Sequence, residues 1–235
     1  MRYIIFSLIP LLVFTIMGCK KDKAGEADCH VIVITPSSGA PVNFYYNNEG
    51  KLETIKEGLT ITSFIYKGDS IIATKTNTTV LYEKRRYKIN GNGLPSNLRI
   101  ESDRSGNNWA NYSYEYNGTE LKKITTTASS SGLSLVSNYT WTNGNITSST
   151  DGTSIHSYEY YSDKTYRAGD ASNLMAMLYD YGMEVIHTKN MRKSDQYTSP
   201  SGSYTLNYNY SFNSDGKVTI ATENSLSFNL QYQCN

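Results

Sequence analysis

The sequence predicts an all-β fold: a large antiparallel meander of repeated hairpins, curled or partly closed, with one short helix near residues 171–181. The first observation is the spacing of tyrosine, because many of the 21 tyrosines stand at alternate positions, as in Tyr112, Tyr114 and Tyr116. A period of two places residues i and i+2 on one face of a strand. Tight-turn dipeptides between these segments are the second observation, and β-branched runs such as residues 31–35 are the third.

Turn signals follow aromatic residues at similar offsets along the chain. Segments 46–52 and 212–218 both consist of an aromatic residue, Asn, two more residues, Gly-Lys and an aliphatic residue. Similar units begin at residues 46, 66, 89, 116 and 141, at intervals of 20 to 27 residues. Each unit predicts a strand, a turn and a second strand, since Asn-Gly and Asp-Gly accept the positive φ of hairpin turns. We expect about fourteen to seventeen strands. Strong twist limits flat sheets to about ten strands, so we expect a sheet of this size to curl or to close partly.

One segment departs from the strand pattern. Apolar side chains recur at i, i+3, i+4 and i+7, at Leu174, Met177, Leu178 and Tyr181. This spacing is typical of an amphipathic helix, and residues 170–173 offer N-cap side chains before it. We expect the helix to plug or cover one open end of the rolled sheet. Residues 187–200 are charged and polar, so we expect them to form a loop before the last three strands.

The N-terminal residues predict export and a lipid anchor. Arg2 precedes an apolar run at residues 4–17, which has the length of a secretory signal and falls short of the about 20 residues of a spanning helix. Cys19 follows Gly18 directly and resembles the lipidated cysteine of bacterial lipoproteins. We expect a signal peptide at residues 1–18, lipidated Cys19 with a flexible tether at 19–30, and a single β domain at 31–235. The alternative is an ordinary signal peptide followed by a chance cysteine.

Two further cysteines lie near the two ends of the β domain. With Cys19 lipidated, Cys29 and Cys234 remain to pair with each other in an oxidising compartment. Such a disulfide closes nearly the whole mature chain, and the loop-entropy account assigns it about 5 kcal/mol. The alternative is two free thiols.

Charge and motifs argue against several functional classes. Arg2 is the one charged residue among the first 18, so the mature chain carries 21 basic and 21 acidic side chains and a formal charge of 21 − 21 = 0. A neutral domain lacks the basic face of a nucleic-acid binder. His30, His156 and His187 show no metal-ligand spacing, and neither a Gly-x-Ser-x-Gly elbow nor a phosphate-binding glycine loop occurs. We therefore expect no enzyme activity, metal, cofactor or nucleic-acid partner.

Aromatic side chains are the candidates for ligand binding. Those that could stack on sugar rings or anchor a partner protein are Trp109, Tyr112, Tyr114, Tyr116 and Trp141. Exposed aromatic rings suit both roles, whereas tyrosine also suits a half-buried pleated surface, which is the competing interpretation. Residues 69–71 resemble a short bacterial O-glycosylation acceptor, which makes Ser70 a candidate for glycosylation unless the match arises by chance.

The recurring aromatic-x-x-x-Gly-Lys-Leu/Val hairpins resemble the tyrosine-aspartate (YD/Rhs-like) repeat. Residues 31–235 as a whole resemble a family of Gram-negative lipoproteins that carries a domain-of-unknown-function label. Its helical insertion, Lys-Asn element, final hairpins and C-terminal cysteine correspond here to residues 174–181, 189–190, 212–218 and 234. The resemblance implies the fold and the location and carries no catalytic signature.

These observations predict a monomeric, non-enzymatic lipoprotein of the outer membrane, on its surface or periplasmic face, that binds a glycan or a partner protein. The rival is a periplasmic carrier of lipid or lipoprotein with an apolar concave face, which requires an unfilled apolar cavity of roughly 300 Å³ or more. A third class is a hydrolase built on facing carboxylates such as Glu101, Asp103 and Glu115.

Overall fold

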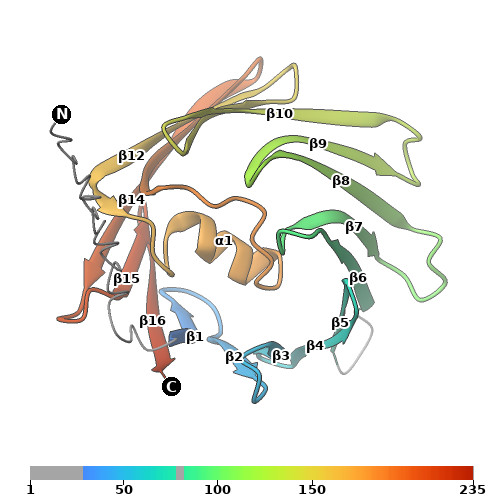
Figure 1. Ribbon diagram of the computed structural model, residues 1–235, viewed down its shortest axis with the longest axis horizontal. Helices are drawn as coiled ribbons and strands as arrows, with labels where there is room; N and C mark the ends of the chain where they lie inside the picture. The colour runs from blue at the N-terminus through green and yellow to red at the C-terminus, as the bar shows by residue number, and fades with distance from the viewer. Residues whose placement is uncertain (1–28, 78–81, 235) are drawn as a thin grey trace, which may run out of the picture.

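The computed structural model describes residues 29–77 and 82–234, which form a closed barrel of sixteen antiparallel strands. Successive strands pair in chain order, and β1 (Cys29–Pro36) also pairs with β16 (Leu226–Cys234), so the meander closes on itself (Figure 1). The antiparallel meander and the expected number of strands are confirmed. The expectation of a curled or partly closed sheet is wrong, because the first and last strands share seven register pairs, from Cys29↔Cys234 to Pro36↔Phe228.

The remaining elements follow one another around the ring. They are β2 (Val42–Tyr46), β3 (Leu52–Glu57), β4 (Thr60–Lys67), β5 (Ser70–Thr76), β6 (Tyr82–Ile89), β7 (Pro95–Glu101), β8 (Trp109–Asn117), β9 (Glu120–Ala128), β10 (Ser134–Thr142), β11 (Asn145–Thr150), β12 (Ile155–Thr165), the helix α1 (Ala171–Tyr179), β13 (Asn190–Ser199), β14 (Gly202–Phe212) and β15 (Val218–Glu223). Residues 1–28, which include the expected signal peptide and Cys19, lie outside the described residues. β1 begins at Cys29, two residues before the expected start of the domain.

The repeated hairpin turns share one construction. Asn47 Oδ1 accepts hydrogen bonds from the backbone N–H groups of Glu49 and Lys51, at 2.9 and 3.0 Å. Asn213 Oδ1 makes the equivalent pair of bonds in the turn between β14 and β15, at 3.1 and 2.9 Å. The glycine that follows each asparagine by three residues has a φ of 72° or 77°, a conformation that a side chain disfavours. This construction explains why the Asn and Gly-Lys positions recur in the sequence.

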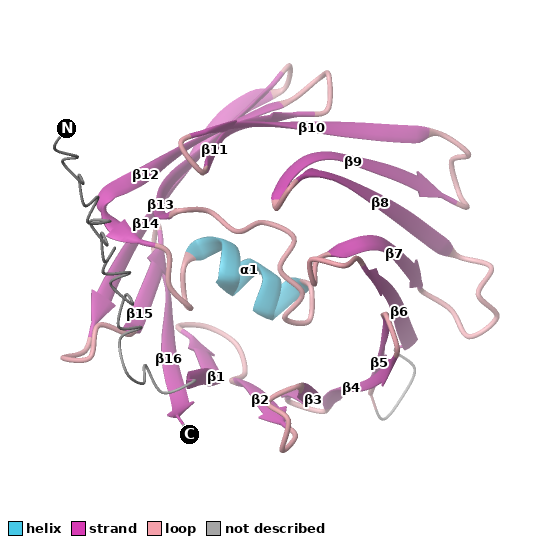
Figure 2. Ribbon diagram, in the orientation of Figure 1, coloured by secondary structure: helices cyan, strands magenta, loops and turns pink. Residues whose placement is uncertain are grey.

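Helix α1 lies within the ring of strands when the barrel is viewed as in Figure 2, and its apolar side chains pack against the strands. Asp170 caps its first turn, accepting a hydrogen bond from Ser172 N at 2.9 Å. The expected apolar positions are confirmed, since Leu174, Met177 and Tyr181 are buried in the main hydrophobic cluster and Leu178 packs against it. Within the described residues, no helix has the length and apolar character needed to cross a membrane.

Both ends of α1 are attached to the barrel wall. At the N-terminal end, Asp170 Oδ2 accepts hydrogen bonds from Arg192 N of β13 at 2.8 Å and from the Tyr210 hydroxyl of β14 at 3.2 Å. At the C-terminal end, Arg85 Nη1 of β6 donates to Tyr179 O at 2.7 Å. The Tyr87 hydroxyl donates to Asp180 O at 3.1 Å. The helix therefore bridges two walls of the barrel, and its polar termini are satisfied by strand residues.

The two faces of the barrel differ in polarity. Apolar side chains from many strands face inward and pack with α1, among them Val42, Phe44, Ile55, Phe64, Leu98 and Val218. The alternate, exposed positions are mostly polar, as at Arg86 and Lys88 on β6, Asn207, Asn209 and Ser211 on β14, and Asn229 and Gln231 on β16. Exposed apolar side chains interrupt this polar coat on several strands, among them Tyr45 on β2, Ile61 and Ile65 on β4, Val136 on β10 and Ile155 on β12. The barrel thus has an interior that is mainly apolar around α1 and a largely polar exterior.

Strand β13 occupies the segment that the sequence assigned to a loop. It pairs with β12 on one side and with β14 on the other, so four strands follow α1 instead of three. The loop expectation is wrong because β13 buries polar side chains, with Arg192, Ser194 and Asp195 each no more than 9% exposed. Apolar alternation, which identifies most half-buried strands, is therefore missing here.

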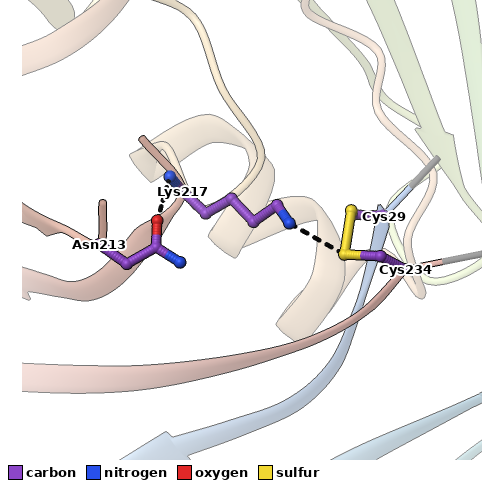
Figure 3. Close-up of a disulfide and its surroundings, with 4 residues drawn as sticks. All are labelled: Cys29, Asn213, Lys217 and Cys234. Carbon is purple, nitrogen blue, oxygen red and sulfur yellow. Dashed lines mark hydrogen bonds between the residues drawn. A yellow bond between two sulfur atoms is a disulfide. The ribbon is translucent and has the colours of Figure 1, made fainter. Parts of the chain in front are cut away.

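A disulfide between Cys29 and Cys234 joins β1 to β16 (Figure 3). The two cysteines are direct register partners, with their Cα atoms 4.1 Å apart and a sequence separation of 205. Lys217 Nζ lies 2.9 Å from Cys234 Sγ, and Lys217 N is bonded to Asn213 in the adjacent turn. The predicted disulfide is confirmed, and it fastens the seam at which the barrel closes.

Candidate ligand-binding site

The aromatic candidates from the sequence do not form one exposed platform. Tyr112, Tyr114 and Tyr116 lie on the inward face of β8 and are half-buried, and the Tyr116 hydroxyl donates to Pro95 O at 2.9 Å. Trp141 Nε1 donates to Leu121 O at 2.7 Å. These side chains are part of the barrel wall, as the competing interpretation of the tyrosines proposed. Trp109 stands on the opposite face of β8, with the Arg99 guanidinium 4.9 Å from its ring.

The carboxylates considered for hydrolysis are engaged in structural contacts. Glu101 accepts hydrogen bonds from Arg99 at 2.9 Å and from Arg86 at 3.1 Å. Burial acts to raise the pKa of Glu101, but these two bonds outweigh it and hold the pKa below its usual value. Asp103 binds the backbone of its own loop, and Glu115 forms an ion pair with a lysine of β9. In the described part of the chain, His, Cys, Asp and Glu side chains form no group of three or more suited to a metal.

Ser70, the candidate for glycosylation, is the first residue of β5, next to the turn that joins it to β4. Its hydroxyl donates to Asp69 Oδ1 at 3.1 Å. Glycosylation of Ser70 remains a prediction.

A different set of side chains meets around a hollow of about 190 Å³ on the inward face of β10 to β13. We call this hollow the tyrosine pocket and define it by Tyr139, Ser149, Ser154, His156, Tyr158 and Tyr197. Four of these residues form one row of register partners across four strands, namely Tyr139, Ser149, His156 and Tyr197. The row arises because each strand presents the same inward face at this level of the barrel.

Hydrogen bonds fix the orientation of the pocket side chains. The hydroxyls of Ser149 and Tyr158 are 2.9 Å apart, and those of Ser154 and Tyr197 are 3.0 Å apart. His156 Nδ1 lies 2.9 Å from Oδ1 of the buried Asp195. The walls of the pocket are therefore pre-organised, and its imidazole is held by a carboxylate.

The aromatic rings of the pocket contact one another. The His156 and Tyr158 rings are nearly parallel, with centroids 5.9 Å apart, and the Tyr197 ring lies 5.0 Å from that of Tyr204. Tyr204 itself is 52% exposed. Burial raises the pKa of Tyr139 to about 12. Its phenol is therefore neutral at physiological pH and offers a hydroxyl rather than a charge.

Sequence reasoning missed the part of the pocket that β13 contributes. Asp195 and Tyr197 lie within the segment expected to be a loop. The alternate spacing of Tyr158 and Tyr160 is typical of a strand, as found in β12, but it does not show which residues of β11 and β13 are their neighbours. Such neighbours depend on register, and a shift of one residue would reverse every side chain.

A second hollow, of about 330 Å³, lies beside the disulfide and is lined by His30, Tyr46, Asn47, Asn48, Gly50 and Gln233. Its lining is mostly polar. The apolar interior, by contrast, packs around Leu174 and Met177 of α1. This hollow does not supply the unfilled apolar cavity that a lipid carrier requires.

The fold and the site define a closed sixteen-stranded barrel with an internal helix and a polar exterior. Similar solved structures include a porin-like protein from Bacteroides uniformis, with 16% identity, a TM-score of 0.62, and coverage of 87% of this chain and 95% of that chain. A porin-like protein from Bacteroides vulgatus is similar too, with 19% identity, a TM-score of 0.61, and coverage of 88% and 99%. No protein-family model and no curated protein sequence matches the chain. At these identities, the likeness shows the fold alone.

Proposed function

We propose that this protein is a non-enzymatic lipoprotein of the outer membrane, whose barrel lies outside the bilayer and binds a glycan in the tyrosine pocket. The observation that carries the binding role is the row of Tyr139, Ser149, His156 and Tyr197, which directs aromatic and hydroxyl groups from four strands into one hollow.

The chemistry of the pocket suits a sugar. Aromatic rings such as those of Tyr158 and Tyr197 pack against the C–H face of a pyranose, while hydroxyl groups and the His156–Asp195 pair exchange hydrogen bonds with its hydroxyls. The hollow, of about 190 Å³, is smaller than the about 300–1,000 Å³ of drug-sized sites. It therefore suits one terminal sugar residue of a longer chain.

The polar exterior supports a barrel that lies outside the hydrocarbon of the membrane. A transmembrane barrel presents an apolar band to lipid, and Arg or Lys at the midplane costs about 2–4 kcal/mol. Here Arg86 and Lys88 occupy exposed positions of β6, while the interior is apolar. A sixteen-stranded porin leaves an aqueous channel, whereas α1 packs inside this barrel. The porin-like fold is thus better suited here to a tethered domain than to a pore.

The tether to the membrane is proposed to be Cys19. It precedes Cys29, the first residue of β1, by 29 − 19 = 10 residues. An extended chain of that length reaches about 35 Å. That reach allows the barrel to stand clear of the bilayer while acyl chains on Cys19 hold it there.

A glycan array probed with the full-length protein tests the binding role. We expect Tyr139→Ala to weaken binding about tenfold, because it removes an aromatic wall of the pocket. Tyr45→Ala is the matched control, since Tyr45 is 46% exposed on β2 and lies outside the pocket. A wild-type protein that binds no glycan, or a Tyr139→Ala variant that binds like the wild type, would contradict the proposal.

A further inference from the structure

The disulfide that closes the barrel lies beside a lysine that favours its cleavage in one direction. We propose that this disulfide is a thiol-exchange site: a low-molecular-weight thiol becomes bonded to Cys29, while Cys234 is released as a thiolate beside Lys217. The reaction goes beyond glycan binding in the tyrosine pocket and does not depend on it.

A lysine ammonium is held against one of the two sulfur atoms. Lys217 Nζ lies 2.9 Å from Cys234 Sγ (Figure 3). In the described part of the chain, this ammonium forms no ion pair with a carboxylate. A cation next to a cysteine stabilises the thiolate, because it compensates the negative charge on sulfur. Lys217 therefore makes Cys234 the better leaving group of the two cysteines.

The backbone of Lys217 is fixed by the turn between β14 and β15. Asn213 Oδ1 accepts a hydrogen bond from Lys217 N at 2.9 Å, and Asn213 N donates to Lys217 O at 3.0 Å. The next residue, Val218, is 0% exposed and belongs to the hydrophobic cluster. The lysine side chain thus extends toward the sulfur from a backbone that is held on both sides.

The two cysteines differ in their surroundings. Cys234 is exposed at the end of β16, and Cys29 is half-buried at the start of β1. The ammonium contacts the sulfur of Cys234 (Figure 3). Exposed disulfides are more labile than buried ones, and exchange is faster when the departing thiol forms a stable anion. We therefore expect an incoming thiolate to attack Cys29 Sγ.

The exchange converts one disulfide into another without net oxidation or reduction. The thiolate of the incoming molecule forms a bond to Cys29 Sγ, and the electron pair of the broken bond leaves on Cys234 Sγ. The released thiolate stays beside Lys217, from where it can attack the mixed disulfide and expel the small thiol again. Backbone pairing of β1 with β16 extends over seven register pairs, so the barrel keeps its closed form during the exchange.

Exchange of the full-length protein with glutathione tests the proposal. Samples are quenched with iodoacetamide, and mass spectrometry of peptides locates the glutathione and the alkylated thiol. We expect glutathione on Cys29 and alkylation on Cys234. Lys217→Gln should slow the exchange about fivefold, because the charge beside the leaving sulfur is lost. Lys217→Arg keeps this charge and should react nearly as fast as the wild type.

Lys67→Gln is the matched control, since Lys67 is an exposed lysine of β4, and it should react like the wild type. Equal rates for Lys217→Gln and the wild type would overturn the role of Lys217. Glutathione found mainly on Cys234 would overturn the direction of cleavage. A folded protein that does not react, or a rate that rises steeply with urea below the unfolding transition, would show a purely structural disulfide and overturn the exchange site. None of these results depends on whether the protein binds a glycan.

Discussion

The Tyr181 hydroxyl donates a hydrogen bond to Glu83 Oε1 at 2.6 Å, and this bond joins the segment after α1 to strand β6. The two residues are 98 positions apart in the sequence. Arg85 donates to the same carboxylate oxygen at 2.7 Å, and its guanidinium lies 4.1 Å from the Tyr181 ring. This contact fixes one end of the internal helix, while Asp170 fixes the other.

Removal of the Tyr181 hydroxyl should weaken the attachment of the helix. We expect Tyr181→Phe to lower the free energy of unfolding by about 2 kcal/mol, because a hydrogen bond to a charged acceptor is lost. Urea titrations followed by fluorescence measure the change. Tyr45→Phe, at an exposed site on β2, is the control and should behave like the wild type. Equal stability of Tyr181→Phe and the wild type would show that this bond does not hold the helix.

The ion-paired Glu101 should make the protein less stable in acid. Its pKa is held below the usual 4.5 by Arg99 and Arg86, although burial opposes them. A depressed pKa stabilises the fold above pH 4.5, and this stabilisation is lost as the pH falls through the folded-state pKa. Glu101→Gln should therefore be less stable than the wild type at pH 7, with a smaller difference at about pH 3. Glu53→Gln, on the exposed part of β3, is the control in urea titrations at both pH values.

Glu223 should show the opposite dependence on pH. Burial, followed by repulsion from Asp195, raises its pKa above 4.5, and its buried Oε2 has no hydrogen-bond partner. A raised carboxyl pKa stabilises the fold below pH 4.5, and this contribution is lost as the pH rises through the folded-state value. Glu223→Gln should thus be more stable than the wild type at pH 7 and similar to it at about pH 4. Thermal unfolding at the two pH values measures this, and a variant that is less stable at pH 7 would contradict it.

The disulfide should contribute strongly to stability because it joins the two ends of the barrel. We expect the Cys29→Ser/Cys234→Ser double variant to lose about 5 kcal/mol of unfolding free energy, the loop-entropy value for a chain of this length. Urea titrations with and without reductant measure the loss. The reduced wild type should match the double variant, and a wild type that is insensitive to reductant would contradict the role of the disulfide.

Local patterns in the sequence predicted most of the strands. Alternating tyrosines, the turns at Asn47 and Asn213, and the helical spacing from Leu174 to Tyr181 each reflect interactions within a few residues. Closure of the barrel was not predictable in this way, because it depends on β1 meeting β16 at the far end of the chain. The pairing of Cys29 with Cys234 was the one sequence feature that indicated this closure.

The candidate site was less predictable because it depends on which faces the strands present. The sequence made Tyr112 and Tyr114 candidates for binding, but both side chains pack against the hydrophobic cluster that includes the internal helix. Arg192, Asp195 and Tyr197 were hidden in a polar segment, since β13 directs charged side chains inward. A buried charged residue breaks the rule that identifies strands by apolar alternation, and such exceptions are expected at functional sites.

The central claim is that a lipid on Cys19, and not the barrel itself, holds the protein at the membrane. Membrane fractionation of the full-length protein with a carbonate wash, after labelling of cells with a palmitate analogue, tests it directly. We expect the wild type to be labelled and to sediment with membranes, and Cys19→Ala to be unlabelled and to remain in the supernatant. An unlabelled Cys19→Ala protein that stays in the washed membranes would mean that the barrel spans the bilayer, which would contradict the account.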